Sequence, residues 1–415
     1  EREATRILHV TEDGDAGNNG SSFDSDPISL QGALDQAGGN DVIVIAAGTY
    51  TPSEQLDASD PDSDDPRTAT FEITGDQDGL KIYGGWAGTE SAFTTPTEVE
   101  NALGGRDLPS NETILSGDIG IEGNASDNAY HVLVFNGGNG IGPDVAANIT
   151  GDTMIGGVTV SGGNANNGGF PDNAGGGLFC DGEGSSNGSS NACSLQIRGS
   201  IFTDNSADFG GAILSDGSEG GESSPQIIDA IFSGNSAGDD GGAVYNYGYN
   251  GVSSPKIINV TFSGNSASTD GGAIYNYGDT GVSSPQITNA TLTGNSAGDD
   301  GGAIYNNGYN GASSPEIIGT TFTGNAATDG GAIYNDGGDG GVSSPQITNS
   351  ILWGNSPTGD GDEIYNRDAT PTLSYTLVEG LSPSGTGNLD GTDPANAPRF
   401  VDADGPDGAF GTLDD

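Results

Sequence analysis

The sequence predicts an all-β fold, a single-stranded right-handed parallel β-helix with coils of 30 residues and an N-terminal helical cap. Two columns of residues at a constant spacing of 30 indicate these coils. The first is Asn205, Asn235, Asn265, Asn295, Asn325 and Asn355, and the second is Phe202, Phe232, Phe262, Leu292, Phe322 and Leu352. A fixed period of this length is typical of a solenoid, whose coils bury their apolar sides only by stacking on each other.

Each repeat contains two short runs of β-branched and aromatic residues, such as Ile287 to Leu292 and Ala303 to Tyr305. Gly, Asn, Asp or Ser closes each run, which is the pattern of strands separated by turns. The repeats show no helical apolar stripe, which argues against helical repeats. Chain chirality favours the right-handed coil, and successive coils stack at about 4.8 Å.

The two columns predict continuous ladders along the axis of the solenoid. We expect the column from Phe202 to Leu352 to form an inward apolar stack. The asparagine column should turn its amides inward, so that each bonds the asparagine above and below. The paired glycines before Ala-Ile-Tyr-Asn, such as Gly271 and Gly272, suit a tight corner that requires a positive φ.

The chain reads as one continuous domain with three parts. Residues 1–150 form an N-terminal cap and irregular first coils, residues 151–370 the regular repeats, and residues 371–415 a C-terminal coil and tail. The only good amphipathic helix, residues 28–37, should cover the open N-terminal end of the core. Because the chain begins with Glu1 rather than Met and shows no signal peptide, we expect a mature, processed product.

The composition excludes several classes of partner. The chain has 59 acidic and 9 basic residues, a formal net charge of −50. Nucleic acids and anionic membranes require a basic surface, so neither is expected to bind. No apolar run reaches the length of a transmembrane helix, and none is expected.

Two cysteines, Cys180 and Cys193, flank a small polar loop. Their alignment with the next repeat places them at the two mouths of that loop, close enough for a disulfide. A disulfide implies an oxidising, extracellular compartment. The alternative is two buried free thiols.

The repeats resemble those of polymorphic outer-membrane proteins in their Phe-x-x-Asn and Gly-Gly-Ala-Ile columns. The whole chain resembles bacterial right-handed parallel β-helix proteins of the choice-of-anchor type. That resemblance rests on the runs at 7–10, 19–22, 47–52, 81–90, 113–118, 351–355 and 400–408. It implies secretion, often with a C-terminal anchor, and no defined activity. The chain departs from the family by ending at Asp415 without an anchor segment.

No catalytic residue is expected. Polysaccharide lyases of this fold need a basic residue near a metal, but Arg198, Lys256 and Arg367 lie on different coils at different repeat positions. Hydrolases need a compact carboxylate cluster, whereas the aspartates here should form regular ladders. His9 and His131 are too few for metal catalysis and are expected as strand residues.

We therefore expect a secreted structural or adhesive protein of the cell surface or extracellular matrix. The alternative is a carbohydrate-binding or polysaccharide-degrading β-helix protein. A binding module would recognise cell-surface or matrix glycans through an outward aromatic column, namely Tyr247, Tyr249, Tyr277 and Tyr309. Those tyrosines could equally cover the loops alone.

An acidic column predicts Ca²⁺ as a ligand. Asp240, Asp270, Asp300, Asp329 and Asp360 precede the glycine corner of successive repeats. Carboxylates stacked about 4.8 Å apart repel by roughly 1 kcal/mol per pair in water, and by several at an effective dielectric of about 20. Ca²⁺ coordinated by these oxygens would remove that repulsion. An acidic surface adapted to high salt is the alternative, with equal weight.

The chain itself is a further expected partner. A β-helix has two open ends with unpaired backbone groups, and the C-terminal end shows no amphipathic helix. Pro394 to Pro398 and the tail from Gly405 could fold over the last coil. Alternatively, a second subunit covers that end, and repeated head-to-tail contact gives a filament.

Overall fold

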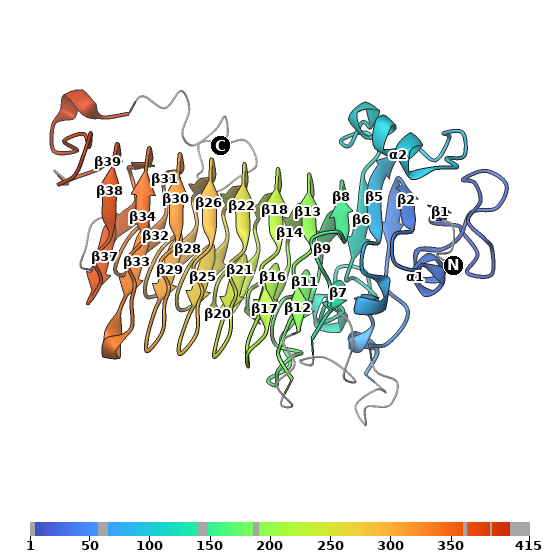
Figure 1. Cartoon of the computed structure of the whole chain (residues 1–415), viewed down its shortest axis with the longest axis horizontal. Coiled ribbons are helices and arrows are strands. Elements are labelled where there is room, and N and C mark those ends of the chain that lie inside the picture. Colours follow the sequence, from blue (N-terminus) through green and yellow to red (C-terminus); the bar gives the residue numbers. More distant parts are fainter. Residues whose placement is uncertain are drawn as a thin grey trace.

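The computed structural model describes residues 5–56, 65–138, 148–185, 191–359, 363–381 and 384–398. These residues wind into one rod of stacked coils, with the N-terminal cap at one end and the last repeats at the other (Figure 1). Neighbouring coils pair in parallel along the rod, as between Phe202 and Phe232. The predicted right-handed parallel β-helix is confirmed.

Four long sheets of described strands run along the rod, and each complete repeat contributes one strand to each sheet. The first sheet contains β1 Ile7–Val10, β2 Val42–Ala46, β5 Lys81–Trp86, β8 Met154–Gly156, β13 Gln196–Arg198, β18 Gln226–Ile228, β22 Lys256–Ile258, β26 Gln286–Thr288, β30 Glu316–Ile318, β34 Gln346–Thr348 and β38 Thr372–Ser374. The second contains β3 Gly48–Tyr50, β6 Thr113–Ser116, β9 Thr159–Ser161, β14 Ile201–Thr203, β19 Ile231–Ser233, β23 Thr261–Ser263, β27 Thr291–Thr293, β31 Thr321–Thr323, β35 Ile351–Leu352 and β39 Leu377–Val378.

The other two long sheets complete each coil. The third contains β10 Asn164–Ala165, β15 Ser206–Phe209, β20 Ser236–Asp240, β24 Ser266–Ala267, β28 Ser296–Ala297, β32 Ala326–Ala327 and β36 Ser356–Pro357. The fourth contains β4 Phe71–Thr74, β7 Leu133–Asn136, β11 Leu178–Asp181, β16 Ile213–Asp216, β21 Val244–Tyr247, β25 Ile274–Tyr277, β29 Ile304–Asn307, β33 Ile333–Asp336 and β37 Ile364–Arg367. A short pair, β12 Ala192–Cys193 and β17 Glu222–Ser223, lies beside the fourth sheet.

Each repeat therefore holds four strands, where the sequence pattern predicted two runs. The run from Ile287 to Leu292 is divided into β26 and β27 because Asn289 adopts a φ of 53° and turns the chain between them. An asparagine side chain tolerates this left-handed conformation better than most residues do. The missed strand β28 is only two residues long, which is too short for an apolar pattern to reveal.

The apolar stack lies in the core as expected. The rings of Phe202 and Phe232 stack with centroids 5.0 Å apart, and those of Phe232 and Phe262 with centroids 4.9 Å apart. Leu292, Phe322 and Leu352 continue this column and are fully buried. One continuous cluster of buried apolar side chains extends from Leu8 in the cap to Val378 in the last coil. Each coil is stabilised by burial against the coils on both sides.

The inward asparagine amides form a hydrogen-bonded ladder within this core. Asn235 Nδ2 donates to Phe202 O and to Asn265 Oδ1, each at 2.9 Å. Asn265 Oδ1 also accepts from the Asn235 backbone N–H at 3.1 Å. The same contacts recur up to Asn355, which donates to the carboxyl of Glu363 instead. All these amides are buried, and the ladder satisfies their donors and acceptors.

The glycine corner has the geometry that the sequence indicates. Gly271 has a φ of 65°, a left-handed conformation that glycine adopts without strain. The next residue, Gly272, is required for a different reason. A Cβ atom on Gly272 would lie 2.2 Å from the carbonyl oxygen of Gly302 in the neighbouring coil.

The N-terminal cap contains the expected helix and a second helix that was not expected. Helix α1 spans Leu30–Gln36 and buries Leu30, Ala33 and Leu34, and the side chain of its N-cap Ser29 accepts from Gly32 N. Helix α2, Pro96–Ala102, carries a Thr95/Glu98 capping box but buries only Val99. A single buried residue gives no amphipathic period, so the sequence pattern did not indicate this second helix. No helix in the described ranges is long and apolar enough to cross a membrane.

Short 3₁₀ helices occur in the loops, at η1 Pro66–Thr68, η2 Gly75–Gln77, η3 Leu103–Gly105, η4 Ala125–Asp127, η5 Gly338–Gly340 and η6 Pro394–Asn396.

At the C-terminal end, the segment after β39 returns to the last coil. Thr386 O accepts from Tyr375 N at 2.9 Å, and Thr376 O accepts from Leu389 N at 3.1 Å. The tail from Gly405 lies outside the described residues. Head-to-tail assembly stays a prediction.

Candidate aromatic groove and acidic cluster

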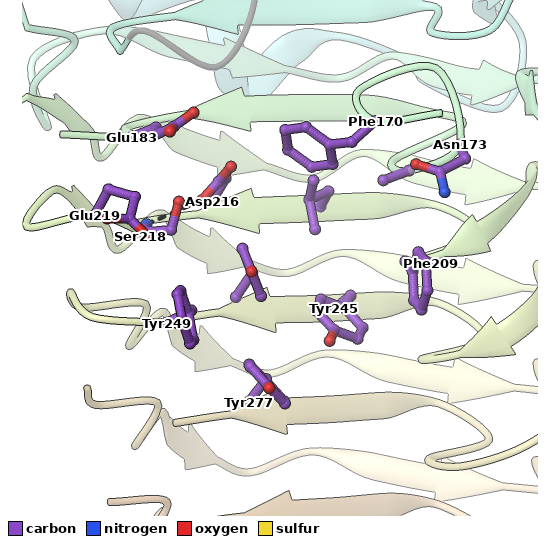
Figure 2. A pocket seen from close by; sticks show the side chains of 13 residues that line it. Phe170, Asn173, Glu183, Phe209, Asp216, Ser218, Glu219, Tyr245, Tyr249 and Tyr277 are labelled. Carbon is purple, nitrogen blue, oxygen red and sulfur yellow. Dashed lines mark hydrogen bonds between the residues drawn. The ribbon is translucent and has the colours of Figure 1, made fainter. Parts of the chain in front are cut away.

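One groove lies on the outer face of the fourth sheet, where the irregular coils meet the regular repeats. Its volume is about 510 Å³. Figure 2 shows its side chains projecting from neighbouring coils around β11, β16, β21 and β25. The lining residues are Phe170, Asn173, Ala174, Glu183, Phe209, Leu214, Asp216, Ser218, Glu219, Tyr245, Tyr247, Tyr249 and Tyr277. We name this site the aromatic groove.

Tyrosines form one wall of the aromatic groove. The rings of Tyr247 and Tyr277 stack with centroids 5.5 Å apart, and those of Tyr247 and Tyr249 with centroids 6.1 Å apart. Strand pairing places Tyr247 and Tyr277 in register, so the coil spacing fixes their rings face to face. Tyr245 is buried, while the other three tyrosines are half-buried and keep part of each ring exposed. The wall is therefore pre-formed and partly accessible to a ligand.

Three of the four predicted tyrosines lie in the aromatic groove, and Tyr309 does not. Tyr309 is exposed, and its hydroxyl donates to the Asp339 carboxylate outside the groove. Asn307 occupies the register position of Tyr277 on the following coil, which is the coil that carries Tyr309. The continuous column of groove tyrosines therefore ends at Tyr277.

Carboxylates gather at one end of the aromatic groove. One carboxylate oxygen from each of Asp181, Glu183 and Asp216 lies within 4.8 Å of those from the other two. We name this set the acidic cluster. Figure 2 shows Glu183 and Asp216 at the same end of the groove, with Glu219 beside them. The expectation that the aspartates form only regular ladders, with no compact cluster, was wrong.

The repeat spacing conceals this cluster from sequence analysis. Asp181 pairs with Asp216 in register on β11 and β16, but 35 positions separate them because a longer loop follows Asp181. A column searched at the regular spacing of 30 misses the pair. The available signal was the dipeptide Asp-Gly that ends both strands, followed by Glu183 in one and Ser218 in the other.

Burial determines the electrostatics of the acidic cluster. Asp216 is fully buried; its Oδ1 accepts from Ser218 N at 2.9 Å, and its Oδ2 has no hydrogen-bond partner among the described residues. Desolvation, with a smaller contribution from the charges of Glu183 and Glu219, raises the pKa of Asp216 to about 7, although hydrogen bonds from Ser218 oppose the shift. Desolvation and Glu219 also raise the pKa of Glu183. Asp181 Oδ1 accepts from Glu183 N at 2.9 Å.

The predicted disulfide between Cys180 and Cys193 is present, with Cα atoms 5.6 Å apart. Both cysteines are buried and join the continuous core. Cys180 directly precedes Asp181, so the disulfide anchors the start of the loop that carries Asp181 and Glu183. The alternative of two free thiols was wrong.

The predicted calcium column lies on the third sheet and the corner after it, away from the acidic cluster. Asp240 Oδ1 accepts from Asp270 N at 3.2 Å, and Asp270 Oδ1 accepts from Asp300 N at 3.0 Å. Asp329 pairs with Asp300 in register, and Asp360 lies outside the described residues. One carboxylate per coil places the third member two coil spacings away, about 9.6 Å. The described part of this column therefore forms no cluster of three, and its calcium binding stays a prediction.

Burial nevertheless raises the pKa values of the aspartates in the same column. Desolvation raises the pKa of Asp240 to about 7. Desolvation, followed by the charges of Asp240 and Asp300, raises the pKa of Asp270 to about 8. Desolvation, followed by the charge of Asp329, raises the pKa of Asp300 to about 6. Near neutral pH the column therefore retains protons, which reduces the repulsion between its carboxylates.

The basic residues lie away from the aromatic groove. Arg198 is exposed and donates from Nε to Gln196, and Arg367 pairs with Asp336. Lys256 is exposed on β22. His131 is fully buried, which lowers its pKa to about 4, and His9 is buried in the cap. None of the described residues that line the groove is basic.

The comparisons with known proteins support the repeat resemblance. Residues 229–247, 259–277, 289–307 and 319–336 match the model of the Chlamydia polymorphic membrane protein repeat. The predicted resemblance to polymorphic-membrane-protein repeats is therefore confirmed, and these repeats indicate a family of outer-membrane or cell-surface proteins. The resemblance to the choice-of-anchor type stays a prediction. No curated protein sequence matches the chain.

Two solved structures have a backbone fold similar to that of this chain. The crystal structure of pectate lyase Pel9A has 14% identity and a TM-score of 0.41, over 96% of this chain and 83% of that one. A rhamnogalacturonan lyase has 11% identity and a TM-score of 0.29, over 90% of this chain and 68% of that one. These similarities carry no argument about activity.

Proposed function

We propose that the chain is a secreted structural or adhesive protein of the cell surface or extracellular matrix that presents the aromatic groove to glycans. The observation that carries this proposal is the wall of stacked, half-buried tyrosines on a rigid rod. A tyrosine offers a flat apolar ring and a polar hydroxyl at little entropic cost. Sugar rings present complementary apolar faces and hydroxyl groups, and the pre-formed wall would bind them without rearrangement.

Three further observations support a location at the cell surface and limit the class of ligand. The repeats match a membrane-protein repeat family, and the disulfide between Cys180 and Cys193 suits an oxidising compartment. The net charge of −50 repels polyanions. A neutral glycan is therefore the preferred ligand class.

The acidic cluster makes polysaccharide hydrolysis the second candidate function. Glycosidases hold their two carboxyl groups about 5–5.5 Å apart when retaining and about 6.5–9.5 Å apart when inverting. One carboxylate oxygen from each of Asp181, Glu183 and Asp216 lies within 4.8 Å of those from the other two. Asp181 and Asp216 are fully buried, which favours a shared proton or a bound cation over a catalytic pair that must contact substrate and water. A uronate lyase is disfavoured because no described groove residue is basic.

Binding of neutral polysaccharides to the immobilised whole chain tests the proposal. We expect saturable binding that weakens about tenfold, or about 1.4 kcal/mol, in the variant with both Tyr247→Ala and Tyr277→Ala. Tyr309→Ala is the matched control, because Tyr309 is an exposed tyrosine outside the aromatic groove. The proposal fails if no neutral glycan binds saturably, or if Tyr309→Ala loses as much affinity as the double variant. Release of new reducing ends would instead support hydrolysis.

A further inference from the structure

The acidic cluster combines features that a solvated acidic patch lacks. Asp181 and Asp216 are both buried, and they occupy register positions on adjacent strands. With Glu183 they bring three carboxylates together, and none of the described residues around the groove supplies a compensating positive charge. Asp216 is fully buried in a groove lined by no basic residue among those described, so its carboxylate must take up a proton or a cation.

A second observation identifies the interior of the cluster as a ligand position. Asp216 Oδ2 is buried without a hydrogen-bond partner among the described residues, although Oδ1 of the same carboxylate accepts from Ser218 N. A buried acceptor without a hydrogen-bond partner is unfavourable, and more so when the group is charged. In Figure 2 the Asp216 carboxylate points towards the coil that carries Glu183. The unsatisfied oxygen therefore belongs to the same Asp216 carboxylate that lies close to the carboxylates of Asp181 and Glu183.

The backbone around the cluster is fixed, so the carboxylates are held before any ligand arrives. A Cβ atom on Gly182 would lie 2.1 Å from Glu222 O, and one on Gly217 would lie 1.8 Å from Val252 O. These distances show that the backbone of each Asp-Gly turn lies directly against the backbone of another coil, with no room for a side chain. The buried disulfide from Cys180 fixes the residue directly before Asp181.

We propose that Asp181, Glu183 and Asp216 form a calcium site at the acidic end of the aromatic groove. The donors are all carboxylate oxygens, the ligand type that Ca²⁺ prefers, with no nitrogen or sulfur ligand to select a transition metal. Ca²⁺ accepts 6–8 oxygen ligands in flexible geometry, so three carboxylates plus backbone carbonyls or water satisfy it. Mg²⁺ requires a near-ideal octahedron and dehydrates reluctantly, which makes it the weaker ligand here. This site is independent of the proposed glycan binding and of the column at Asp240, Asp270 and Asp300.

Tyrosine-sensitised terbium luminescence tests the calcium site on the whole chain after chelator treatment. Tb³⁺ substitutes for Ca²⁺ in oxygen-ligand sites, and Tyr247 occupies the register position next to Asp216. Tyrosine excitation should therefore produce saturable terbium emission with one ion per chain, and Ca²⁺ should displace it more readily than Mg²⁺. Calorimetric titration with CaCl₂ should give the same stoichiometry.

Matched variants distinguish the acidic cluster from the acidic column. Asp216→Asn and Glu183→Gln should each weaken the terbium and calcium affinity about tenfold or more, since the loss of even an indirect contact costs about 10–100-fold. Asp270→Asn, in the column, should leave the affinity unchanged. Glu183 is only half-buried, so Glu183→Gln keeps the test decisive if Asp216→Asn fails to fold. The proposal is overturned if Glu183→Gln binds like the wild type, if Asp270→Asn abolishes binding, or if no saturable emission occurs.

Discussion

The asparagine ladder makes one prediction whose size follows from its contacts. In Asn265→Ala, the side chain that links three coils is removed. Asn265 Oδ1 accepts from Asn235 N at 3.1 Å and from Asn235 Nδ2 at 2.9 Å. Asn265 Nδ2 donates to Phe232 O and to Asn295 Oδ1, each at 2.9 Å. The substitution therefore removes four hydrogen bonds from the core.

The four lost hydrogen bonds do not contribute equally to the loss of stability. Asn235 Nδ2 keeps Phe202 O as its acceptor, and Asn295 Oδ1 still accepts from the backbone N–H of residue 265. The Asn235 backbone N–H loses its acceptor in a site without solvent access, and Phe232 O, which lies on the paired strand β19, loses one of its donors. One unsatisfied buried group costs about 1–3 kcal/mol and a lost hydrogen bond about 0.5–1.5 kcal/mol, so we expect a loss of about 2–4 kcal/mol of unfolding free energy.

Urea unfolding followed by circular dichroism measures this loss. Gln286→Ala is the matched control, because it removes an amide that is exposed on β26 of the neighbouring coil. Surface substitutions of this kind usually change the stability by less than about 0.5 kcal/mol. A loss below about 1 kcal/mol in Asn265→Ala, or one equal to that of Gln286→Ala, would refute the assignment of the ladder as a stabilising element.

Three other predictions concern the disulfide, the acidic column and the glycine corner. Replacing Cys180 and Cys193 together by Ser should lower the unfolding free energy by about 3 kcal/mol, the value for a loop of about 15 residues, and denaturant unfolding with and without reductant checks this. Burial raises the pKa of Asp240 to about 7, of Asp270 to about 8 and of Asp300 to about 6, against an ordinary value of 3.8. The folded chain then binds more protons than the unfolded chain between about pH 4 and pH 8, so its stability should fall as the pH rises through this range. Melting temperatures in chelator should show the fall, Asp270→Asn should reduce it, and a flat profile would contradict it. Gly242→Ala places a Cβ atom 2.1 Å from Gly272 O and should destabilise the chain by about 1–3 kcal/mol or more in thermal unfolding, whereas Gly104→Ala, with no heavy atom within 4 Å, should be neutral.

The regular coils could be predicted from the sequence because each residue packs against its own copy above and below. Phe232 contacts Phe202 and Phe262, and Asn265 bonds Asn235 and Asn295. Residues at the same repeat position therefore share the same structural environment, which makes that environment visible in the sequence. The glycine corner is readable for the same reason. The sequence pattern did not reveal that each apolar run is divided into two strands, because a single residue in the left-handed conformation, such as Asn289, makes the division.

The tyrosine wall of the aromatic groove could be predicted from its column, whereas the rest of the groove and the acidic cluster could not, since the coils that build them differ in length. Phe179 pairs with Leu214 across 35 positions, and Leu214 pairs with Tyr245 across 31. The third sheet also shifts its register between Ala207 and Phe209. A change of length moves residues out of their columns, so spacing no longer indicates which side chains are neighbours.

The fourth sheet shows why its outer face is the part of the molecule to test for binding. On four successive coils, from β21 to β33, its inward amides Asn246, Asn276, Asn306 and Asn335 repeat and bond each other at 2.8 Å. On the same four coils, the next position along each strand is Tyr247, Tyr277, Asn307 and Asp336, so it holds three different residue types. Packing of the core requires constancy at the amide position and places no such demand on the neighbouring one. The proposed glycan, by contacting several coils at once, would account for the aromatic and charged residues along this line.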